Sequence, residues 1–532
     1  MNFALSSLDI GIIVTSIFAV VGVGLWAGRN QEKSARGYFL ASGRLPWYII
    51  GAAFVSTSVS SEQIVGTVGA TYKYGMGIAN WEWWLVPVYG LLTLVFVPMW
   101  LRNRVTTVPE FLARRFGPLC ADIYSWVMLG AYVFVFMVTV LYSGSLALKE
   151  LTGWNFYAVL WGMVVLVALY TTKGGLSSVI WTDALQCLML VGGGVILFFI
   201  ALGKVPGGWA AMQAASPARF HLYHPANDPV APFPAIVLAT FGVFIFYSAG
   251  NQVMVQRILA ARSTWDGLMG VLWAGVINLL RPLVTCFLGL IVFHWTNVMH
   301  AAPPLTNPDQ AFPFALKYLA PDWGLRGIIL AGFLAAVMSA TSALANSTAT
   351  IFSLDIYKRI FHPDADDARL VRMGRLASAA ALAIAALVAP SVAHLGGVFL
   401  YFQHGVAYLA TPFISVILLG LLSKRTNYQG ALFGLIGGSA ITLAIAIGAP
   451  LIGINISWLY LAAIAQAITM VGIVIVSHRT PLPAESLWRP FQWTPSALRQ
   501  YDDGVRRPWY QSVLMWWAIY IVVWVYLYWR FW

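Results

Sequence analysis

The run Ser56-Thr57-Ser58-Val59-Ser60-Ser61-Glu62-Gln63-Ile64-Val65-Gly66-Thr67-Val68-Gly69-Ala70 interrupts an otherwise apolar segment that is long enough to span a membrane. Five hydroxyl side chains, one carboxylate and one amide stand between residues 56 and 63, and two glycines follow. A polar group without a partner in hydrocarbon costs several kcal/mol, so such a stretch is tolerated only where it lines a cavity or is buried in protein. Broken helices of this kind hold a solute and an ion near the midplane of membrane transporters.

The composition indicates a polytopic membrane protein. The chain has 532 residues, of which 60% are hydrophobic and 9% are charged, whereas a soluble domain carries about 25% charged residues. Trp81-Glu82-Trp83-Trp84 and Trp516-Trp517 fit interfacial aromatic belts. The three cysteines are far apart, so no disulfide framework and no metal-ligand spacing is expected. The first residues carry no Lys or Arg, which argues against a cleaved signal peptide.

Apolar segments of near-spanning length recur along the whole chain. We predict 14 of them, at about 8–27, 45–65, 79–101, 122–148, 154–172, 178–202, 233–255, 266–296, 326–352, 371–390, 394–422, 428–447, 452–477 and 510–532.

The basic residues divide unequally between the two sets of loops. Of the 31 Lys and Arg residues, 23 fall in odd-numbered loops, Arg257 among them, and only Arg281 falls inside a span. The positive-inside rule places these loops in the cytoplasm. We therefore expect a multi-pass protein of the cell membrane, surrounded by lipid, with both termini extracytoplasmic. The net charge of +12 belongs to these loops and indicates no nucleic-acid partner. No Walker-type glycine loop occurs, so uphill transport would need an ion gradient.

Charged side chains inside spans are rare and indicate function or helix packing. Four such residues stand out: Glu62 in the polar break, Glu82 in the tryptophan cluster, Asp183 early in the sixth span and Arg281 in the eighth. Glu62 and Arg281 could neutralise each other in an ion pair that fixes helix packing, or they could have a functional role. We expect Glu82 to lie near an aqueous mouth.

The ninth span is rich in small and hydroxyl residues around Ser339. A sodium ion prefers hard oxygen ligands. Backbone carbonyls freed near Ser56 and Val59, together with the Ser339 hydroxyl, could supply them, although the spacing by itself favours a small-residue packing face. Amides in other spans suit a neutral hydroxylated solute, because each amide both donates and accepts hydrogen bonds.

Several motifs together resemble one known family. They are Ala41-Ser42-Gly43-Arg44-Leu45-Pro46-Trp47, the break at 60–66, Glu82-Trp83, the run from Gly174 to Asp183, and the run from Asn346 to Lys358. They resemble the sodium/solute symporter family, with the sodium/glucose cotransporter branch as the nearest match. The resemblance covers about residues 5 to 480.

The resemblance implies an all-α fold of leucine-transporter type, with two inverted five-helix repeats. The parts implied are an extra N-terminal helix and loop (1–44), the first repeat (45–202), an external loop (203–232), the second repeat (233–422), two further helices (423–477), a cytoplasmic loop (478–509) and a last helix (510–532). A solute would bind between the broken first helices of the two repeats.

The resemblance also assigns candidate solute-binding residues. The matching positions are Gln63, Glu82, the inner-gate Tyr247, Gln403 and the outer-gate Phe399. Four positions depart from the family pattern. An Asn of the family is Ser58 here, a Ser is Leu85, a second Asn is Phe244, and a pocket Lys is Asn278 with Arg281 one helical turn farther on.

The sodium site implied by the resemblance uses the backbone carbonyls of Ser56, Val59 and Ala336 and the hydroxyl of Ser339. The second serine of the family's pair is Ala340 here. Asp183 matches an acidic residue on the sodium exit path.

The leading hypothesis is a sodium-coupled symporter, not an enzyme, that imports a sugar or sugar-like polyol by alternating access. The alternative keeps the fold but carries an anion, such as a sugar acid, an organic acid or an amino acid, with Arg281 near the pocket. A passive channel or a membrane sensor is a third interpretation. The sequence shows no nucleophile–base pair or metal cluster that would favour a membrane enzyme.

Overall fold

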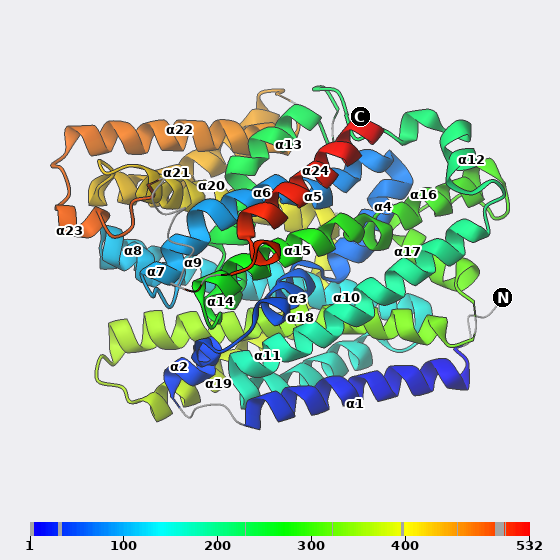
Figure 1. Cartoon of the computed structure of the whole chain (residues 1–532), viewed down its shortest axis with the longest axis horizontal. Helices are drawn as coiled ribbons and strands as arrows, with labels where there is room; N and C mark the ends of the chain where they lie inside the picture. Colours follow the sequence, from blue (N-terminus) through cyan, green and yellow to red (C-terminus); the bar gives the residue numbers. More distant parts are fainter. Residues whose placement is uncertain are drawn as a thin grey trace.

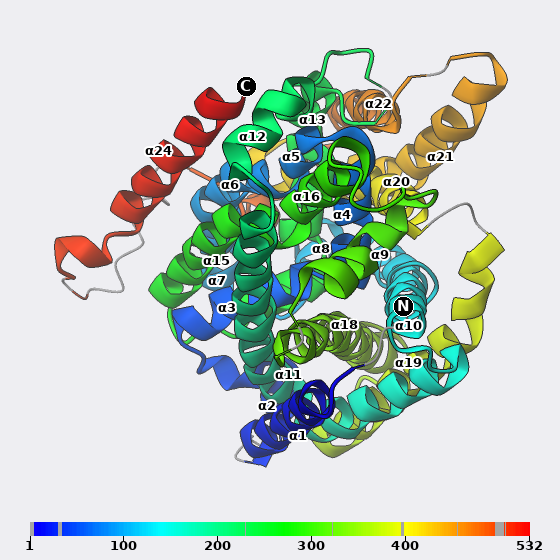
Figure 2. The ribbon, with the colours of Figure 1, turned by 90° about the vertical axis from the view of Figure 1, so that its right-hand side faces the viewer.

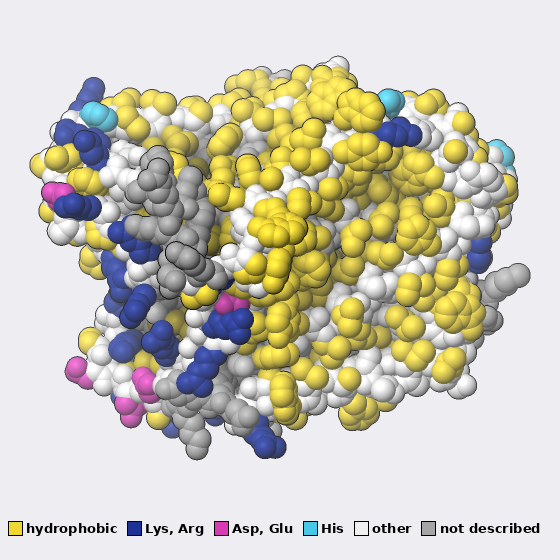
Figure 3. Space-filling model, viewed as in Figure 1, with side chains coloured by type: hydrophobic (Ala, Val, Ile, Leu, Met, Phe, Trp, Pro, Cys, Tyr) yellow, Lys and Arg dark blue, Asp and Glu magenta, His cyan; other side chains and the backbone are white. Residues whose placement is uncertain are grey.

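The computed structural model describes residues 5–29, 34–228, 230–321, 323–394, 398–454, 456–494, 505 and 507–532. The long helices run along one axis of the molecule (Figure 1). Helix α1 (Ser7–Arg29) begins and helix α24 (Val513–Phe531) ends at the same end of this axis. On the visible face, Lys and Arg side chains gather at the other end, and hydrophobic side chains cover the middle (Figure 3). This distribution suits a chain that crosses a bilayer many times.

Each predicted span coincides with helical structure. Twelve helices among the described residues are long and apolar enough to cross a membrane, and two shorter apolar helices, Trp47–Ser58 and Phe156–Thr172, occupy the remaining predicted spans. The first of these is short because the polar break ends it. The predicted boundaries differ from the observed ones mainly where a helix continues past its apolar core.

The first half of the chain contains the first broken helix and the long helices that surround it. After α1 come α2 (Ala35–Leu40), α3 (Trp47–Ser58), α4 (Ser61–Tyr74), α5 (Asn80–Trp83), α6 (Leu85–Leu91), α7 (Val97–Arg102), α8 (Val108–Phe116), α9 (Pro118–Ala131), η4 (Tyr132–Met137), α10 (Val138–Thr152), α11 (Phe156–Gly203) and α12 (Gly208–Ala215).

The second half repeats this order, with a broken helix followed by long ones. It contains α13 (Phe233–Ala239), η6 (Thr240–Phe244), η7 (Phe246–Gly250), α14 (Gln252–Leu259), α15 (Thr264–Thr285), α16 (Phe287–Phe293), α17 (Ala311–Phe314), α18 (Leu325–Thr350), η11 (Ile351–Phe361), α19 (Asp367–Val388), α20 (Val398–Leu422), α21 (Tyr428–Leu451), α22 (Trp458–Arg479), α23 (Glu485–Trp488) and α24.

Helix α11 contains two predicted spans joined at a sharp bend. At Gly175 the backbone takes φ 53° and ψ −153°. Residues with a Cβ rarely adopt this conformation, whereas glycine does so at little cost. The bend separates Phe156–Thr172 from Gly175–Gly203, as the two predicted spans require.

Helix α18 lies at the centre of the molecule (Figure 2). It packs extensively against α11, α19 and α1. Within the span Leu325–Phe361, 89% of the apolar stretch is buried, compared with 17% for the apolar stretches of α1 and α24. Its Ala, Ser and Thr residues allow this close approach on all sides. At its N-terminal end the Asp9 carboxylate of α1 accepts a hydrogen bond from the Gly327 backbone N–H at 2.7 Å. The helix that carries Ser339 is therefore held rigidly.

Helix α4 is fixed at its C-terminal half by contact with α16. A Cβ placed on Gly289 would stand 2.2 Å from the Val68 carbonyl oxygen and 2.7 Å from the Tyr72 backbone nitrogen. Both of these atoms belong to the backbone of α4, so no side-chain rotation relieves the clash. Gly192 in α11, by contrast, has no atom within 4 Å of such a Cβ.

Gly289→Ala should therefore destabilise the protein, whereas Gly192→Ala should not. Alanine favours a helix by about 1 kcal/mol over glycine, but overpacking at Gly289 costs roughly 1–3 kcal/mol. We expect a lower thermal unfolding midpoint in detergent for Gly289→Ala and an unchanged or higher one for Gly192→Ala. Equal midpoints for the two variants would contradict the tight α4–α16 contact.

Candidate functional site

The polar stretch that interrupts the second predicted span is a true helix break. Helix α3 ends at Ser58, Val59 is extended with φ −113° and ψ 111°, and α4 starts at Ser61. The Ser61 hydroxyl donates to the Val140 carbonyl at 3.0 Å and contacts the Ser143 hydroxyl at 2.6 Å. Helix α10 thus satisfies polar groups of the break, as the hydrocarbon environment demands.

A second break lies at the corresponding place in the second half of the chain. Segment η7 ends at Gly250, Asn251 is extended with φ −94° and ψ 121°, and α14 follows. The Tyr132 hydroxyl donates to Asn251 Oδ1 at 2.6 Å, and the Tyr124 hydroxyl donates to the Gly250 carbonyl at 2.6 Å. The two breaks both leave backbone groups unpaired within their own helices in the interior of the molecule.

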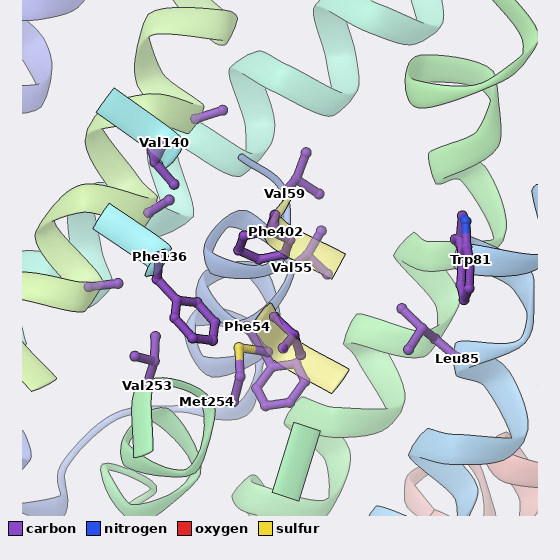
Figure 4. Packing of buried hydrophobic residues seen from close by; sticks show 14 of the residues in the cluster. Phe54, Val55, Val59, Trp81, Leu85, Phe136, Val140, Val253, Met254 and Phe402 are labelled. Atoms are coloured by element: carbon purple, nitrogen blue, oxygen red, sulfur yellow. The ribbon is translucent and has the colours of Figure 1, made fainter. Parts of the chain in front are cut away.

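A cavity lies beside the first break, with about 620 Å³ of empty space when its mouth is included. It brings together residues from both broken helices and from α5, α6, α15 and α20. Its lining residues are Ser58, Gln63, Trp81, Leu85, Val243, Phe244, Tyr247, Arg281, Phe402, Gln403 and Val406. Figure 4 shows Trp81 and Leu85 projecting from neighbouring turns, and Phe402 next to Phe136.

Five of the predicted solute-binding residues line this cavity, namely Ser58, Gln63, Tyr247, Gln403 and Arg281. Two others stand behind the wall, since Glu82 and Asn278 are fully buried and contact the lining residues. The side chains of Phe399 and Glu62 lie outside the described residues.

Glu82 forms a buried ion pair with Arg281. Arg281 Nη2 lies 2.7 Å from Glu82 Oε2, and both side chains are at most 1% exposed. Gln63 Nε2 donates to Glu82 Oε1 at 2.9 Å, while Arg281 Nη1 donates to Ser58 Oγ at 3.1 Å and to Asn278 Oδ1 at 2.9 Å. The expectation that Glu82 lies near an aqueous mouth is therefore wrong, because the guanidinium allows the carboxylate to be buried.

The candidate sodium ligands on two different helices meet. Ser56 Oγ in α3 donates to Ser339 Oγ in α18 at 3.0 Å, and Ser339 Oγ donates to Asp183 Oδ1 at 2.6 Å. Because the Ser339 proton points to the carboxylate, the lone pairs of its oxygen are left for Ser56 or for a cation. These side chains offer hard oxygen ligands of the kind that suits Na⁺. The backbone carbonyls of Ser56, Val59 and Ala336 stay predicted ligands.

Asp183 is paired with a residue that the sequence placed elsewhere. Arg257 Nη2 lies 3.1 Å from Asp183 Oδ2, and neither side chain is exposed. Arg257 Nε donates to the Thr57 hydroxyl at 2.7 Å, and this hydroxyl donates to Asp183 Oδ2 at 3.2 Å. The assignment of Arg257 to a cytoplasmic loop is therefore wrong. Helix α14 continues past the predicted span, and the ion pair makes burial of the guanidinium tolerable.

The sequence did not identify Arg257 as the partner of Asp183, nor Trp81 and Phe402 as lining residues of the cavity. For Arg257 a signal was present, because apolar residues continue on both sides of it, while Arg281, the one basic residue in a predicted span, cannot pair with both Glu82 and Asp183. For the aromatic residues no such signal exists. Aromatic residues at helical spacing fit a packed core equally well, and only the tertiary structure turns them toward a cavity.

A smaller cavity of about 300 Å³ lies next to the first, between the two breaks. Tyr247 and Phe402 line both cavities. The smaller one also contains Thr57, Ser60 and Asn251. Tyr247 and Phe402 thus stand between the central cavity and a smaller one of mixed polar and apolar lining that reaches Ala340.

Comparison with known proteins places the chain among sodium-coupled carriers. The family model described as sodium:solute symporter family matches residues 38–438. The sodium/glucose cotransporter of Vibrio parahaemolyticus is 32% identical over 460 residues, which cover 82% of this chain and 84% of that protein. The sodium/myo-inositol cotransporter of Canis lupus familiaris is 30% identical, with 91% and 75% covered.

Among solved structures, a Na⁺-coupled sialic acid symporter in a substrate-bound outward-open state is similar, with a TM-score of 0.79 and 21% identity. The similarity covers 90% of this chain and 99% of that one. It confirms the predicted fold class, an all-α membrane protein of leucine-transporter type.

The Asp183–Arg257 pair can be tested by a double-mutant cycle. Asp183→Asn leaves a buried guanidinium without its carboxylate, which costs about 3–5 kcal/mol. Asp183→Asn combined with Arg257→Gln should recover much of that loss in thermal stability in detergent. Glu485→Gln at the exposed pair with Arg489 is the control and should leave stability nearly unchanged. Additive losses in the double variant would show that the two buried residues act independently.

Proposed function

Because the chain belongs to the sodium:solute symporter family, we propose that it is a sodium-coupled secondary symporter for a neutral sugar or polyol. The solute binds in the central cavity between the two helix breaks, against Gln63, Gln403 and Tyr247. Sodium binds at Ser56, Val59, Ala336 and Ser339. The relatives named above for glucose and myo-inositol support a neutral polyhydroxylated solute.

The observation that carries this proposal is the Glu82–Arg281 pair. Arg281 is the one basic side chain in the described lining of the cavity, and Glu82 already neutralises it at 2.7 Å. A solute carboxylate would have to compete with Glu82 for the guanidinium and leave the displaced carboxylate buried, which is costly. The cavity therefore suits a neutral solute better than an anion.

Coupling follows from the position of the two sites on one broken helix. Ser56 and Val59 stand at the end of α3, and Gln63 stands in the first turn of α4. A cation that orders Ser56 and Val59 also sets the direction of α4, and hence the position of Gln63. Thermodynamic linkage requires that sodium raise the solute affinity by the same factor as the solute raises the sodium affinity.

The charge distribution supports an orientation in the cell membrane. Lys and Arg side chains gather at the end of the visible face opposite the start of α1 and the end of α24 (Figures 1 and 3). The positive-inside rule assigns the basic end to the cytoplasm, which makes both termini extracytoplasmic. Tyr247 and Phe402 then form the inner barrier of the cavity.

Uptake into proteoliposomes tests the coupling. An inward sodium gradient should drive accumulation of a neutral hexose or inositol above its external concentration, which a passive channel cannot do. Ser339→Ala removes one oxygen ligand and should raise the half-saturating sodium concentration by about tenfold, equivalent to 1.4 kcal/mol. The control is Ser125→Ala, since within the described part of the chain this buried hydroxyl bonds only the Ala121 carbonyl of its own helix. Unchanged sodium dependence in Ser339→Ala would contradict the assigned site.

Matched sugar pairs test the charge of the solute. D-glucose and D-glucuronate, or D-galactose and D-galacturonate, differ by one carboxylate in place of a hydroxymethyl group. In sodium buffer a neutral member should raise the thermal unfolding midpoint of the protein, because a ligand that binds only the folded state stabilises it. The uronates should produce no shift. Stabilisation by the uronates alone would favour the anionic alternative.

A further inference from the structure

The central cavity has two unlike walls. Polar side chains stand on the side of the first break and α15, where Ser58, Gln63 and Arg281 lie. A second part of the lining, which we call the apolar wall, consists of buried hydrophobic side chains from α5, α6, η6 and α20: Trp81, Leu85, Val243, Phe244, Phe402 and Val406. Gln403 of α20 and Tyr247 of η7 also line the cavity and belong to its polar part.

Ring contacts, both within the lining and to residues behind it, hold the apolar wall in place. The Trp81 ring lies 5.4 Å from Phe244 and 6.0 Å from Trp458, measured between centroids. The Phe402 ring lies 5.3 Å from Phe136 at 81°, an edge-to-face contact (Figure 4). Aromatic pairs of this geometry are mutually stabilising. The wall is therefore preformed and cannot easily be exchanged for polar groups by side-chain rotation.

The wall offers little to a solute hydroxyl. Its one side-chain donor, Trp81 Nε1, has almost no accessible surface, so a solute hydroxyl in the cavity does not reach it in this structure. A hydroxyl pressed against this wall would lose its hydrogen bonds to water and find no replacement, which opposes binding. A methyl or methylene group in the same place gains by leaving water.

The departures noted in the sequence fall on this wall. Leu85 and Phe244 stand where related chains carry a serine and an asparagine, as the resemblance implied. Both residues line the cavity. Each replaces a hydrogen-bonding side chain by an apolar one. Gln63 and Gln403, by contrast, keep the amides that the resemblance implies at these positions.

We propose that the solute is a neutral deoxyhexose, a monosaccharide in which one C–OH is replaced by C–H, and that its deoxygenated edge lies on the Trp81–Leu85–Phe244–Phe402 wall. This inference rests on the proposed function. The hydroxyls on the other edge bond to Gln63, Gln403 and Arg281.

The experiment compares sugars that differ by a single oxygen. Sodium-driven uptake into proteoliposomes is measured with D-galactose against 6-deoxy-D-galactose, and with D-glucose against 6-deoxy-D-glucose. In at least one pair the deoxy sugar should have a half-saturating concentration about tenfold lower, which corresponds to 1.4 kcal/mol. A hydroxymethyl sugar that equals or exceeds its deoxy partner in both pairs would overturn the inference.

A variant assigns the preference to the wall. Leu85→Ser combined with Phe244→Asn restores hydrogen-bonding groups and should reduce or reverse the preference for the deoxy sugar. Leu85→Val combined with Phe244→Leu is the matched control, which keeps the wall apolar and should keep the preference. The same ratio in both double variants would show that the wall does not select the solute. The comparison in the unaltered protein does not depend on either variant folding.

The two proposals fail in different ways. Sodium-dependent uptake that favours fully hydroxylated sugars overturns the deoxyhexose inference and leaves the symporter function intact. If none of these sugars, and no inositol, is accumulated in a sodium gradient, the proposed function itself is wrong.

Discussion

Two buried carboxylates, each paired with a guanidinium, organise the interior of this protein. An ion taken out of water without a partner is so costly that its presence dictates what surrounds it. Glu82 lies 2.7 Å from Arg281, and Asp183 lies 3.1 Å from Arg257. Each pair joins helices far apart in the sequence, so satisfying the charges also fixes the packing of the broken helices.

Both pairs hold the first break, from different sides. Arg281 donates to Ser58 before the break, while Glu82 accepts from Gln63 after it. Asp183 and Arg257 share the hydroxyl of Thr57, next to Ser58. The first pair stands beside the cavity and the second beside the candidate sodium ligands. A change at either site therefore reaches the same few residues of backbone, which is the physical requirement for coupling.

The second pair also links the two broken helices directly. Arg257 belongs to α14, which follows the second break, and Thr57 belongs to α3, which precedes the first. Through Ser339 the network extends to α18, the most enclosed helix. If α3 or α14 moves during transport, the hydrogen bonds that Thr57, Asp183, Arg257 and Ser339 form must either break or move with the helix.

The sequence by itself determined the spans, the position of the first break and the family, because these depend on local polarity and on contiguous motifs. It also identified most of the polar residues of the site. Which charged residues pair with each other was decided only by the tertiary structure. Nothing in the sequence pairs Glu82 with Arg281, and the apolar residues around Arg257 do not identify Asp183 as its partner, since the paired residues are 199 and 74 positions apart. The apolar wall is likewise a tertiary feature, because Trp81, Phe244 and Phe402 come from three separate helices and face one cavity only after these pack.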